Sequence, residues 1–480
     1  MSVRFALVVL LMASLLAPAA LTTPGEVPSG GELDLTWYEE VVDSEGLVGA
    51  YASIAFLEDG TEPAFAYQDY GEKDLRFAFW NVSGWTVELV DSSDWSGFFP
   101  TLRTDSGRTT VSYIVAGSPR ELRFAERIEG AWHIRTVWSG GTVAGSMAVG
   151  LDGARYIAFG ARSGLLLASE TDSGWNFTTI DSSVPGTAGG VSLSIREGAF
   201  AVGYAFLDAN GTGVTKVAWG NPGAWEIETL ATGTGSSVSV AINSTGRPHA
   251  LFGIEERLAH AYPTDGGWVE ETVDRGTRVG DIHIYLSMAI GPDDAPRVAY
   301  LVGDVDDYRL MYAVRGASSW LHSEVTRQLG RGLWVTLGID EFGDPHLAYL
   351  DVGYPTELGD LWHATTRSRS VRSLSLRVEP RTLNVQSRGR WVNAQVTVEK
   401  TTSSDIDLTS LALNGVPAVR AEILNGTRIL AKFDRAAFQT TVPVGNDVEV
   451  ALTGTWTDGQ SFRATDRLRI IDPGTGDGKP

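Results

Sequence analysis

Short segments of alternating hydrophobic and polar residues recur along residues 37 to 366, and seven of them begin at a tryptophan. They read TWYEEVVD, GWTVELVD, AWHIRTVW, GWNFTTID, AWEIETLA, GWVEETVD and SWLHSEVT. The anchoring residues are Trp37, Trp85, Trp132, Trp175, Trp225, Trp268 and Trp320, spaced by 48, 47, 43, 50, 43 and 52 residues. A period in the forties is typical of the four-stranded blade of a β-propeller.

Three further strand types complete each repeat in a fixed order. A strand of small and apolar residues comes first (YASIAFL, SVSVAI), a second follows a tight turn (PAFAYQD, PHLAYLD), and a third precedes the tryptophan strand (LRFAFW, LMYAVR). The frequent glycines and tryptophans, 55 and 15 residues, agree with many turns and aromatic strands. The pattern predicts an all-β protein with a seven-bladed propeller.

The two ends of the repeat complete one another. Residues 37–42 form a tryptophan strand without preceding partners, and residues 361–366 (LWHATT) form a third strand without a following tryptophan strand. We expect residues 37–42 to form the outer strand of the last blade, because closing the ring removes two exposed sheet edges.

A Pro-His pair begins two of the second strands, at His249 and His346, and His260 and His363 hold equivalent places on third strands. We expect these four rings to be hydrogen-bonded inside or between blades. The alternative is a metal site shared by His249 with His260, or by His346 with His363.

The regions outside the repeat predict four more segments. Residues 1–20 resemble a secretory signal peptide, with Arg4, an apolar core and small residues for cleavage, and an uncleaved anchor is the alternative. A Pro/Gly-rich linker at 21–36 precedes the propeller at 37–368. Alternating segments across 373–471 predict an immunoglobulin-like β-sandwich without a cysteine pair, and 472–480 is a flexible tail.

The repeat resembles a family of secreted bacterial and archaeal propeller repeats with the unit SLALDSNGxPHISYYD…LKYAxxxGxxWxxExVD. The stretch TLNVQSRGRWVNAQV…LTGTWTDGQSFRATDRLRII is similar to a small sandwich module appended to exported proteins. These resemblances imply the fold and export. They do not imply an activity, because propellers carry unrelated functions.

The composition of the chain limits the classes of molecule that it can be expected to bind. The net charge of −21 argues against nucleic acid and anionic membranes. With no cysteine, the chain cannot be a lipoprotein, a disulfide scaffold or a thiolate metal site. We expect a monomer that is secreted or at the cell surface, with an extracellular polysaccharide or protein as partner. Glycosylation sequons stand at Asn81, Asn176, Asn210, Asn243 and Asn425.

The longer, more varied loops all belong to one face of the predicted ring, which we call the variable-loop face. It receives the outer-to-inner and second-to-third strand connections, and binding residues are commonly carried on such loops. Candidate ligand-binding residues are Tyr70, Asp94, Trp95, Phe98, Phe99, Arg278, His283, Tyr285, Tyr308, Arg331 and Tyr354. The alternative is that most of these aromatics only anchor loops.

Acidic residues are also frequent on this face. No cofactor is required, but Asp208, Asp306 and Asp307 are candidate calcium ligands, because calcium prefers several carboxylate oxygens. The other interpretation is that the acids there, including Asp43, Asp91, Asp181 and Asp274, are solvated.

Two functions follow from the pattern. The first is a binding protein that holds a polysaccharide or protein on the variable-loop face; a purely structural envelope role is a separate alternative. The second is a carbohydrate-active enzyme, a glycoside hydrolase or polysaccharide lyase on a sialidase-like propeller. The Asp-box turn of sialidases is missing from its expected place, and no catalytic residues can be assigned.

Overall fold

A computed structural model describes residues 31–472 apart from short segments. The segments left out are 58–59, 61, 82–83, 94, 106, 185–188, 234–236, 255–256, 276–285, 304–307, 328–330, 353–358, 368–372, 388, 400–402, 404–405 and 458–460. The chain divides into two compact units, residues 1–367 and 368–480. Among the described residues, no helix has the length and apolar character needed to span a membrane.

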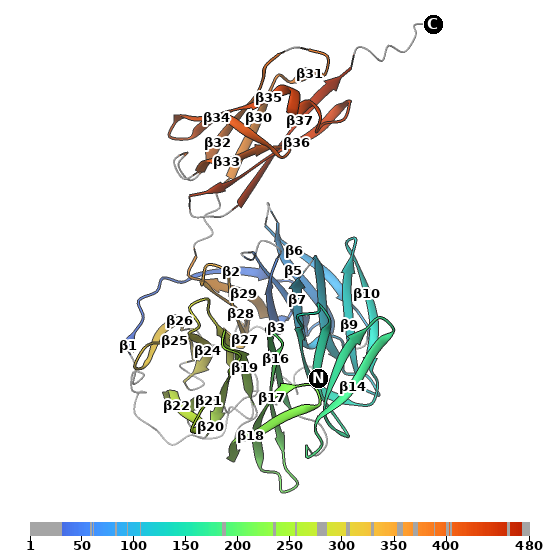
Figure 1. The fold of residues 1–480 in the computed structure, drawn as a ribbon, viewed down its shortest axis with the longest axis vertical. Coiled ribbons are helices and arrows are strands. Elements are labelled where there is room, and N and C mark those ends of the chain that lie inside the picture. Colours follow the sequence, from blue (N-terminus) through green and yellow to red (C-terminus); the bar gives the residue numbers. More distant parts are fainter. Residues whose placement is uncertain are drawn as a thin grey trace. The chain divides into compact units, whose positions relative to one another are not determined.

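The first unit is a seven-bladed β-propeller (Figure 1), as the repeat predicts, and every blade is an antiparallel sheet of four strands. The inner strands are β3 (Val48–Phe56), β7 (Phe98–Asp105), β11 (Thr142–Val149), β15 (Gly190–Arg196), β19 (Val238–Ile242), β23 (Leu286–Ile290) and β27 (Arg331–Ile339). The second strands are β4 (Pro63–Asp69), β8 (Arg108–Val115), β12 (Arg155–Ala161), β16 (Ala199–Leu207), β20 (Pro248–Ile254), β24 (Pro296–Val302) and β28 (Pro345–Val352).

The third strands are β5 (Asp74–Asn81), β9 (Glu121–Ile128), β13 (Gly164–Thr171), β17 (Gly213–Asn221), β21 (Arg257–Thr264), β25 (Arg309–Arg315) and β29 (Gly359–Thr365). The outer strands are β6 (Gly84–Asp91), β10 (Ala131–Trp138), β14 (Gly174–Asp181), β18 (Ala224–Gly233), β22 (Gly267–Arg275), β26 (Trp320–Thr326) and β2 (Tyr38–Asp43).

The N-terminal strand closes the ring. Strand β2 pairs antiparallel with β29, with Glu40 opposite His363, so it is the outer strand of the last blade and the prediction is confirmed. A further short strand, β1 (Gly31–Glu32), pairs in parallel with β26. It lies in the segment that the sequence suggested as a linker.

The recurrent tryptophan makes a contact between blades. Its indole N–H donates to the outer strand of the preceding blade from Trp132 to Glu88 (3.1 Å), from Trp320 to Glu271 (3.2 Å) and from Trp37 to Ser323 (3.1 Å). At these three interfaces the ring packs against the neighbouring sheet while its only polar atom finds an acceptor. Trp85, Trp175 and Trp268 instead meet an aromatic ring of the preceding blade. The sequence period is therefore the period of this inter-blade contact.

A second inter-blade contact, the Asp–Tyr latch, joins the end of an outer strand to the second strand of the next blade. A buried tyrosine hydroxyl donates to a buried aspartate from Tyr67 to Asp43 (2.7 Å), Tyr113 to Asp91 (2.6 Å), Tyr204 to Asp181 (2.6 Å) and Tyr300 to Asp274 (2.7 Å). Arg76, Arg123 and Lys216 on third strands add ion pairs to three of them. The interpretation of these four aspartates as solvated acids is wrong, because folding uses them to join blades.

The histidine pairs are internal, as expected. His249 Nδ1 lies 3.0 Å from His260 Nε2, and His260 Nδ1 lies 3.0 Å from a carboxylate oxygen of Glu271. His346 and His363 repeat the arrangement at 3.0 Å, with Glu40 as the carboxylate at 2.9 Å. Among the described residues, no group of three or more His, Cys, Asp or Glu is arranged to hold a metal ion.

The second unit consists of eight strands in the order β30-β32-β35-β34-β33-β36-β37-β31. They are β30 (Ser373–Glu379), β31 (Thr382–Asn384), β32 (Trp391–Glu399), β33 (Ile406–Leu413), β34 (Val416–Asn425), β35 (Arg428–Asp434), β36 (Gly445–Trp456) and β37 (Ser461–Ile471). Two four-stranded halves, joined by the short β33–β34 pairing, share one core, so the module is nearly closed like a barrel. A short helix, α2 (Arg435–Gln439), is capped by Asp434.

Candidate functional site

The seven inner strands surround a central channel, and a ring of seven hydroxyl side chains lines it. The ring consists of Ser53, Thr101, Ser146, Ser192, Ser239, Ser287 and Thr336. Five of the serines accept the free edge N–H of the next inner strand; for example, Val240 N donates to Ser192 Oγ at 3.0 Å. The hydroxyl ring therefore satisfies backbone groups that an edge strand leaves unpaired.

Two residues before the ring, toward the variable-loop face, aromatic side chains gather at the mouth of the channel. The Tyr51 ring centroid lies 4.7 Å from that of Phe99, 5.5 Å from Phe98 and 5.2 Å from Trp334. A cavity of about 290 Å³ is lined by Tyr51, Phe99, Trp334 and the hydroxyl ring. We call Tyr51, Phe98, Phe99 and Trp334 the aromatic mouth.

A second set of rings extends the aromatic mouth outward over the first blade. Trp95 stacks on Phe98 with centroids 6.1 Å apart, and Tyr70 meets Trp95 edge-on at 5.5 Å. The Lys73 ammonium lies 4.8 Å from the Trp95 ring centroid, a cation–π contact. The result is a continuous, partly exposed aromatic surface that runs from a second-to-third strand loop to the channel.

The backbone under this surface is strained. Tyr51, Trp95, Phe99 and Trp334 have φ values of 54°, 53°, 48° and 52°, in the left-handed region that glycine favours. Each such residue costs about 1–2 kcal/mol. Register shifts in β3, β7 and β27 accompany Tyr51, Phe99 and Trp334, and bulges of this kind redirect side chains. Strained backbone conformations are concentrated at functional sites, and here they direct several bulky rings toward one place.

The two phenols of this surface are hydrogen-bond donors at neutral pH. Burial, with a smaller effect of Tyr70, raises the pKa of Tyr51 to about 12, although the charge of Arg120 opposes the rise. Burial also raises the pKa of Tyr70. The Tyr70 hydroxyl oxygen is buried and has no hydrogen-bond partner among the described residues. A ligand with an acceptor oxygen would satisfy it.

The structure brings together four of the residues that the sequence suggested: Tyr70, Trp95, Phe98 and Phe99. Tyr308 is half-buried beside the core shared by the last two blades, and Arg331 begins β27. The remaining candidates, Asp94, Arg278, His283, Tyr285, Tyr354, Asp306 and Asp307, lie outside the described residues.

Sequence reasoning missed Tyr51 and Trp334, the centre of the aromatic mouth. The sequence does contain a signal for them. When the seven inner strands are aligned on the serine or threonine of the hydroxyl ring, the residue two positions before it is aromatic in four consecutive blades and small in the other three. The aromatic ones are Tyr285, Trp334, Tyr51 and Phe99, and the small ones are Ala144, Gly190 and Ser237.

The candidate calcium ligand Asp208 supports its own turn. Its carboxylate Oδ1 accepts the backbone N–H groups of Asn210 and Thr212, both at 2.8 Å. Among the sequons, the Asn243 side chain likewise accepts N–H groups of its own turn, and Asn81 is hydrogen-bonded to Thr86. Asn176, Asn210 and Asn425 belong to exposed positions.

The chain matches no family model and no curated protein. Solved structures with similar folds include PL25 ulvan lyase, a polysaccharide lyase, at 12% identity and TM-score 0.47, covering 67% of this chain and 94% of that chain. AofleA from Arthrobotrys oligospora has 12% identity and TM-score 0.41 over 60% and 90% of the two chains. The Hadza microbial sialidase has 14% identity and TM-score 0.39 over 61% and 73%. These similarities concern the fold, and function must be argued from the site.

Proposed function

We propose that the protein is an exported binding protein that holds a polysaccharide chain on its variable-loop face, at the aromatic mouth. The observation that carries the proposal is the convergence of Tyr51, Phe99 and Trp334, each in left-handed backbone, over a cavity of about 290 Å³. The fold bears that strain although smaller residues would fill the same positions, as they do in three other blades.

Aromatic faces suit a sugar ring because its axial C–H groups form an apolar surface while its hydroxyls point outward. The surface from Tyr70 through Trp95 and Phe98 to the aromatic mouth offers several such faces in a row. The protonated phenols and the hydroxyl ring add donors and acceptors for sugar oxygens. An extended row of rings favours a chain of sugars over a single one.

We propose binding rather than bond cleavage for these residues. The raised pKa values of Tyr51 and Tyr70 keep both hydroxyls protonated at neutral pH, so both can donate hydrogen bonds to sugar oxygens. Export is proposed from the resemblance of the N-terminal residues to a signal peptide. Because calcium is a candidate ligand of this face, binding is measured both with and without it.

Isothermal titration against a panel of neutral and acidic polysaccharides, with and without calcium, tests the proposal. For a polysaccharide that binds, Trp334→Ala should weaken the affinity by roughly 10- to 100-fold, the usual effect of removing a central aromatic anchor. Phe342→Ala is the matched control, because Phe342 is an exposed aromatic in a β27–β28 turn away from the mouth. Equal losses in both variants would contradict the site. Release of reducing ends or unsaturated products would contradict a purely binding function.

A further inference from the structure

The central channel carries one large charged side chain at a level where every other blade is small. Two residues after the hydroxyl ring, β7 presents Arg103. The equivalent residues of the other inner strands are Ala55, Ala148, Ser194, Ala241, Ala289 and Gly338. A single guanidinium therefore occupies a space that six small residues leave open.

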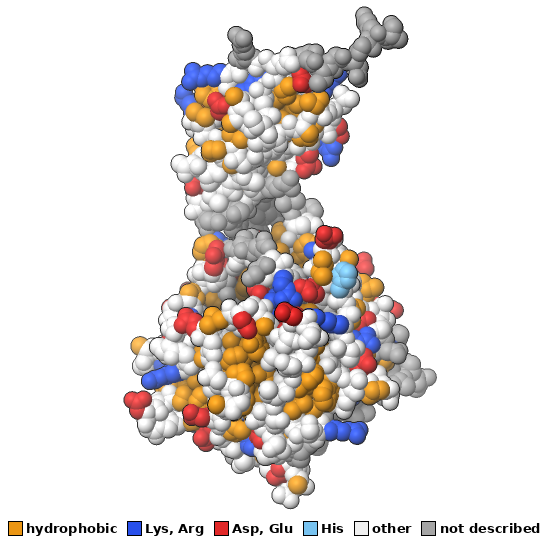
Figure 2. Space-filling view, turned by 45° about the vertical axis from the view of Figure 1, so that its right-hand side comes forward, with side chains coloured by type: hydrophobic (Ala, Val, Ile, Leu, Met, Phe, Trp, Pro, Cys, Tyr) orange, Lys and Arg blue, Asp and Glu red, His pale blue; other side chains and the backbone are white. Residues whose placement is uncertain are grey.

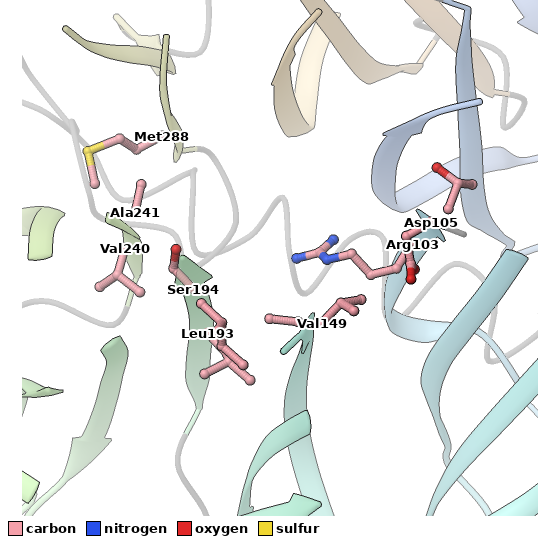
Figure 3. A pocket seen from close by; sticks show the side chains of 11 residues that line it. Arg103, Asp105, Val149, Leu193, Ser194, Val240, Ala241 and Met288 are labelled. Carbon is pink, nitrogen blue, oxygen red and sulfur yellow. The ribbon is translucent and has the colours of Figure 1, made fainter. Parts of the chain in front are cut away.

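Arg103 borders two cavities. It belongs to the lining of the 290 Å³ cavity below the aromatic mouth, and of a second cavity of about 390 Å³ at the C-terminal ends of the inner strands. In Figure 3 its side chain extends from β7 toward the part of the wall formed by Leu193, Ser194 and Val149, whereas Asp105 points away. Arg103 is thus a wall residue that the two cavities share.

The positive charge of Arg103 lacks a carboxylate partner among the described residues. One N–H group, on Nη1, donates to the carbonyl oxygen of Leu102 at 2.7 Å. The carboxylate whose charge acts on Arg103 is Asp105, and Asp105 is held by the buried Arg155 at 2.6 Å. Burial lowers the pKa of Arg103 to about 10 despite Asp105, so the group is still charged at neutral pH.

We propose that the central channel binds a small oxyanion through the Arg103 guanidinium, a site that does not depend on the proposed polysaccharide function. Four N–H donors of the planar fork remain for a carboxylate, sulfate or phosphate group. Burial of the guanidinium in a wall that also contains the apolar side chains of Val149, Leu193 and Met288 strengthens the attraction by reducing screening by water. An uncompensated charge in such surroundings is unfavourable, and an anion compensates it.

Isothermal titration of the full chain with sodium sulfate, sodium phosphate and glucuronate tests this site, with glucose as the neutral comparison. We expect millimolar or tighter binding of at least one anion. Arg103→Met, which keeps the length but removes the charge, should weaken it by about 10- to 100-fold. Arg103→Lys keeps the charge without the fork and should fall between. The control Arg247→Gln removes an exposed arginine and should bind like the parent chain.

Comparing the three anions shows whether the natural ligand is a free inorganic ion or an acidic group of a larger molecule. Binding of sulfate or phosphate supports a free inorganic ion, and binding of glucuronate alone supports the acidic sugar of a larger ligand. No binding of any anion at 50 millimolar, or equal binding by the parent chain and both Arg103 variants, overturns the proposal. Sulfate and phosphate are not sugars, so their titration decides the anion site whatever the polysaccharide panel shows, and a failed polysaccharide site and a failed anion site are distinguishable.

Discussion

The Asp–Tyr latch between the first two blades yields a stability prediction with a definite size. In Tyr113→Phe, the hydroxyl that donates to Asp91 Oδ2 at 2.6 Å is lost, and the ring that fills the core stays. A hydrogen bond to a charged group contributes about 1.5–3 kcal/mol. Asp91 keeps its bonds from Ser93 (2.6 and 2.9 Å) and Arg123 (3.0 Å), so we expect the lower part of that range, about 1.5–2 kcal/mol.

Asp91→Ala should cost more, about 3 kcal/mol or above, because it removes all the bonds from Ser93, Tyr113 and Arg123 and leaves the Tyr113 hydroxyl buried without its acceptor. Arg123 is not stranded, since Glu121 also holds it at 2.9 Å. In the double variant the two losses should overlap, and the coupling energy should be about 1–2 kcal/mol. Urea unfolding followed by tryptophan fluorescence at pH 7 measures all four proteins.

A reverse substitution serves as the control for this cycle. The next interface has Phe159 in place of the tyrosine and Trp138 in place of the aspartate, with ring centroids 5.6 Å apart. Phe159→Tyr should destabilise by about 1–3 kcal/mol, because the new hydroxyl meets a ring instead of a carboxylate. A coupling energy near zero between positions 91 and 113, or a neutral Phe159→Tyr, would refute the view that the latch joins the blades.

Three further predictions concern the ring as a whole. Deleting residues 31–43 removes β1 and β2, and limited proteolysis should then cleave the last blade at concentrations of protease that the parent chain resists. Ser192→Ala removes the acceptor of the Val240 N–H and should lower the free energy of unfolding in urea by about 1 kcal/mol. Burial and the neighbouring His260 lower the pKa of His249 from 6.5 to about 4 in the folded chain. As the pH falls, the unfolded chain therefore protonates His249 before the folded chain does. Stability should therefore fall by roughly 3 kcal/mol between pH 6.5 and 4, and a pH series of urea midpoints should show a weaker fall for His249→Gln.

The propeller could be predicted from the sequence because the repeat marks contacts between blades. The tryptophans of the outer strands contact the preceding blade, some through an indole hydrogen bond and others through ring packing, so the period in sequence equals the period in space. Ring closure followed from the missing strands at the two ends of the repeat. In the second unit, β34 (Val416–Asn425) gives a weak signal because its half-exposed residues lack clear alternation, and α2 is too short to give a periodic one.

The candidate site was predictable only in part. Loop aromatics such as Trp95 and Phe98 stood out by type and place, and the structure confirms that they lie together. Tyr51 and Trp334 belong to inner strands, which a strand pattern assigns to the core. Their side chains reach the channel mouth because the backbone turns into the left-handed region, and no local residue preference signals that turn when the residue is aromatic. The acids of the latch were misassigned because burial depends on the neighbouring blade, which sequence periodicity does not place.

The distribution of charge and apolar surface also bears on where a ligand binds. Figure 2 shows acidic and basic side chains interspersed with exposed hydrophobic ones on the side of the propeller in view. Outer strands expose hydrophobic side chains such as Leu89 and Phe177, which are 54% and 40% exposed. Their charged neighbours pair locally, as Arg127 does with Glu88 at 2.7 Å, so this surface presents no single sign of charge to a partner.

A propeller built from near-copies of one unit reveals its function where the copies differ without a structural need. The hydroxyl ring is filled in all seven blades, and in five of them its serine accepts the edge N–H of the next inner strand. Two positions above it the residue is aromatic in four consecutive blades, and two positions below it a single Arg103 replaces a small residue. Folding demands neither, and both carry a cost, in left-handed backbone or in a buried charge. Because both departures line the same channel, we expect ligands along this axis rather than on the outer strands.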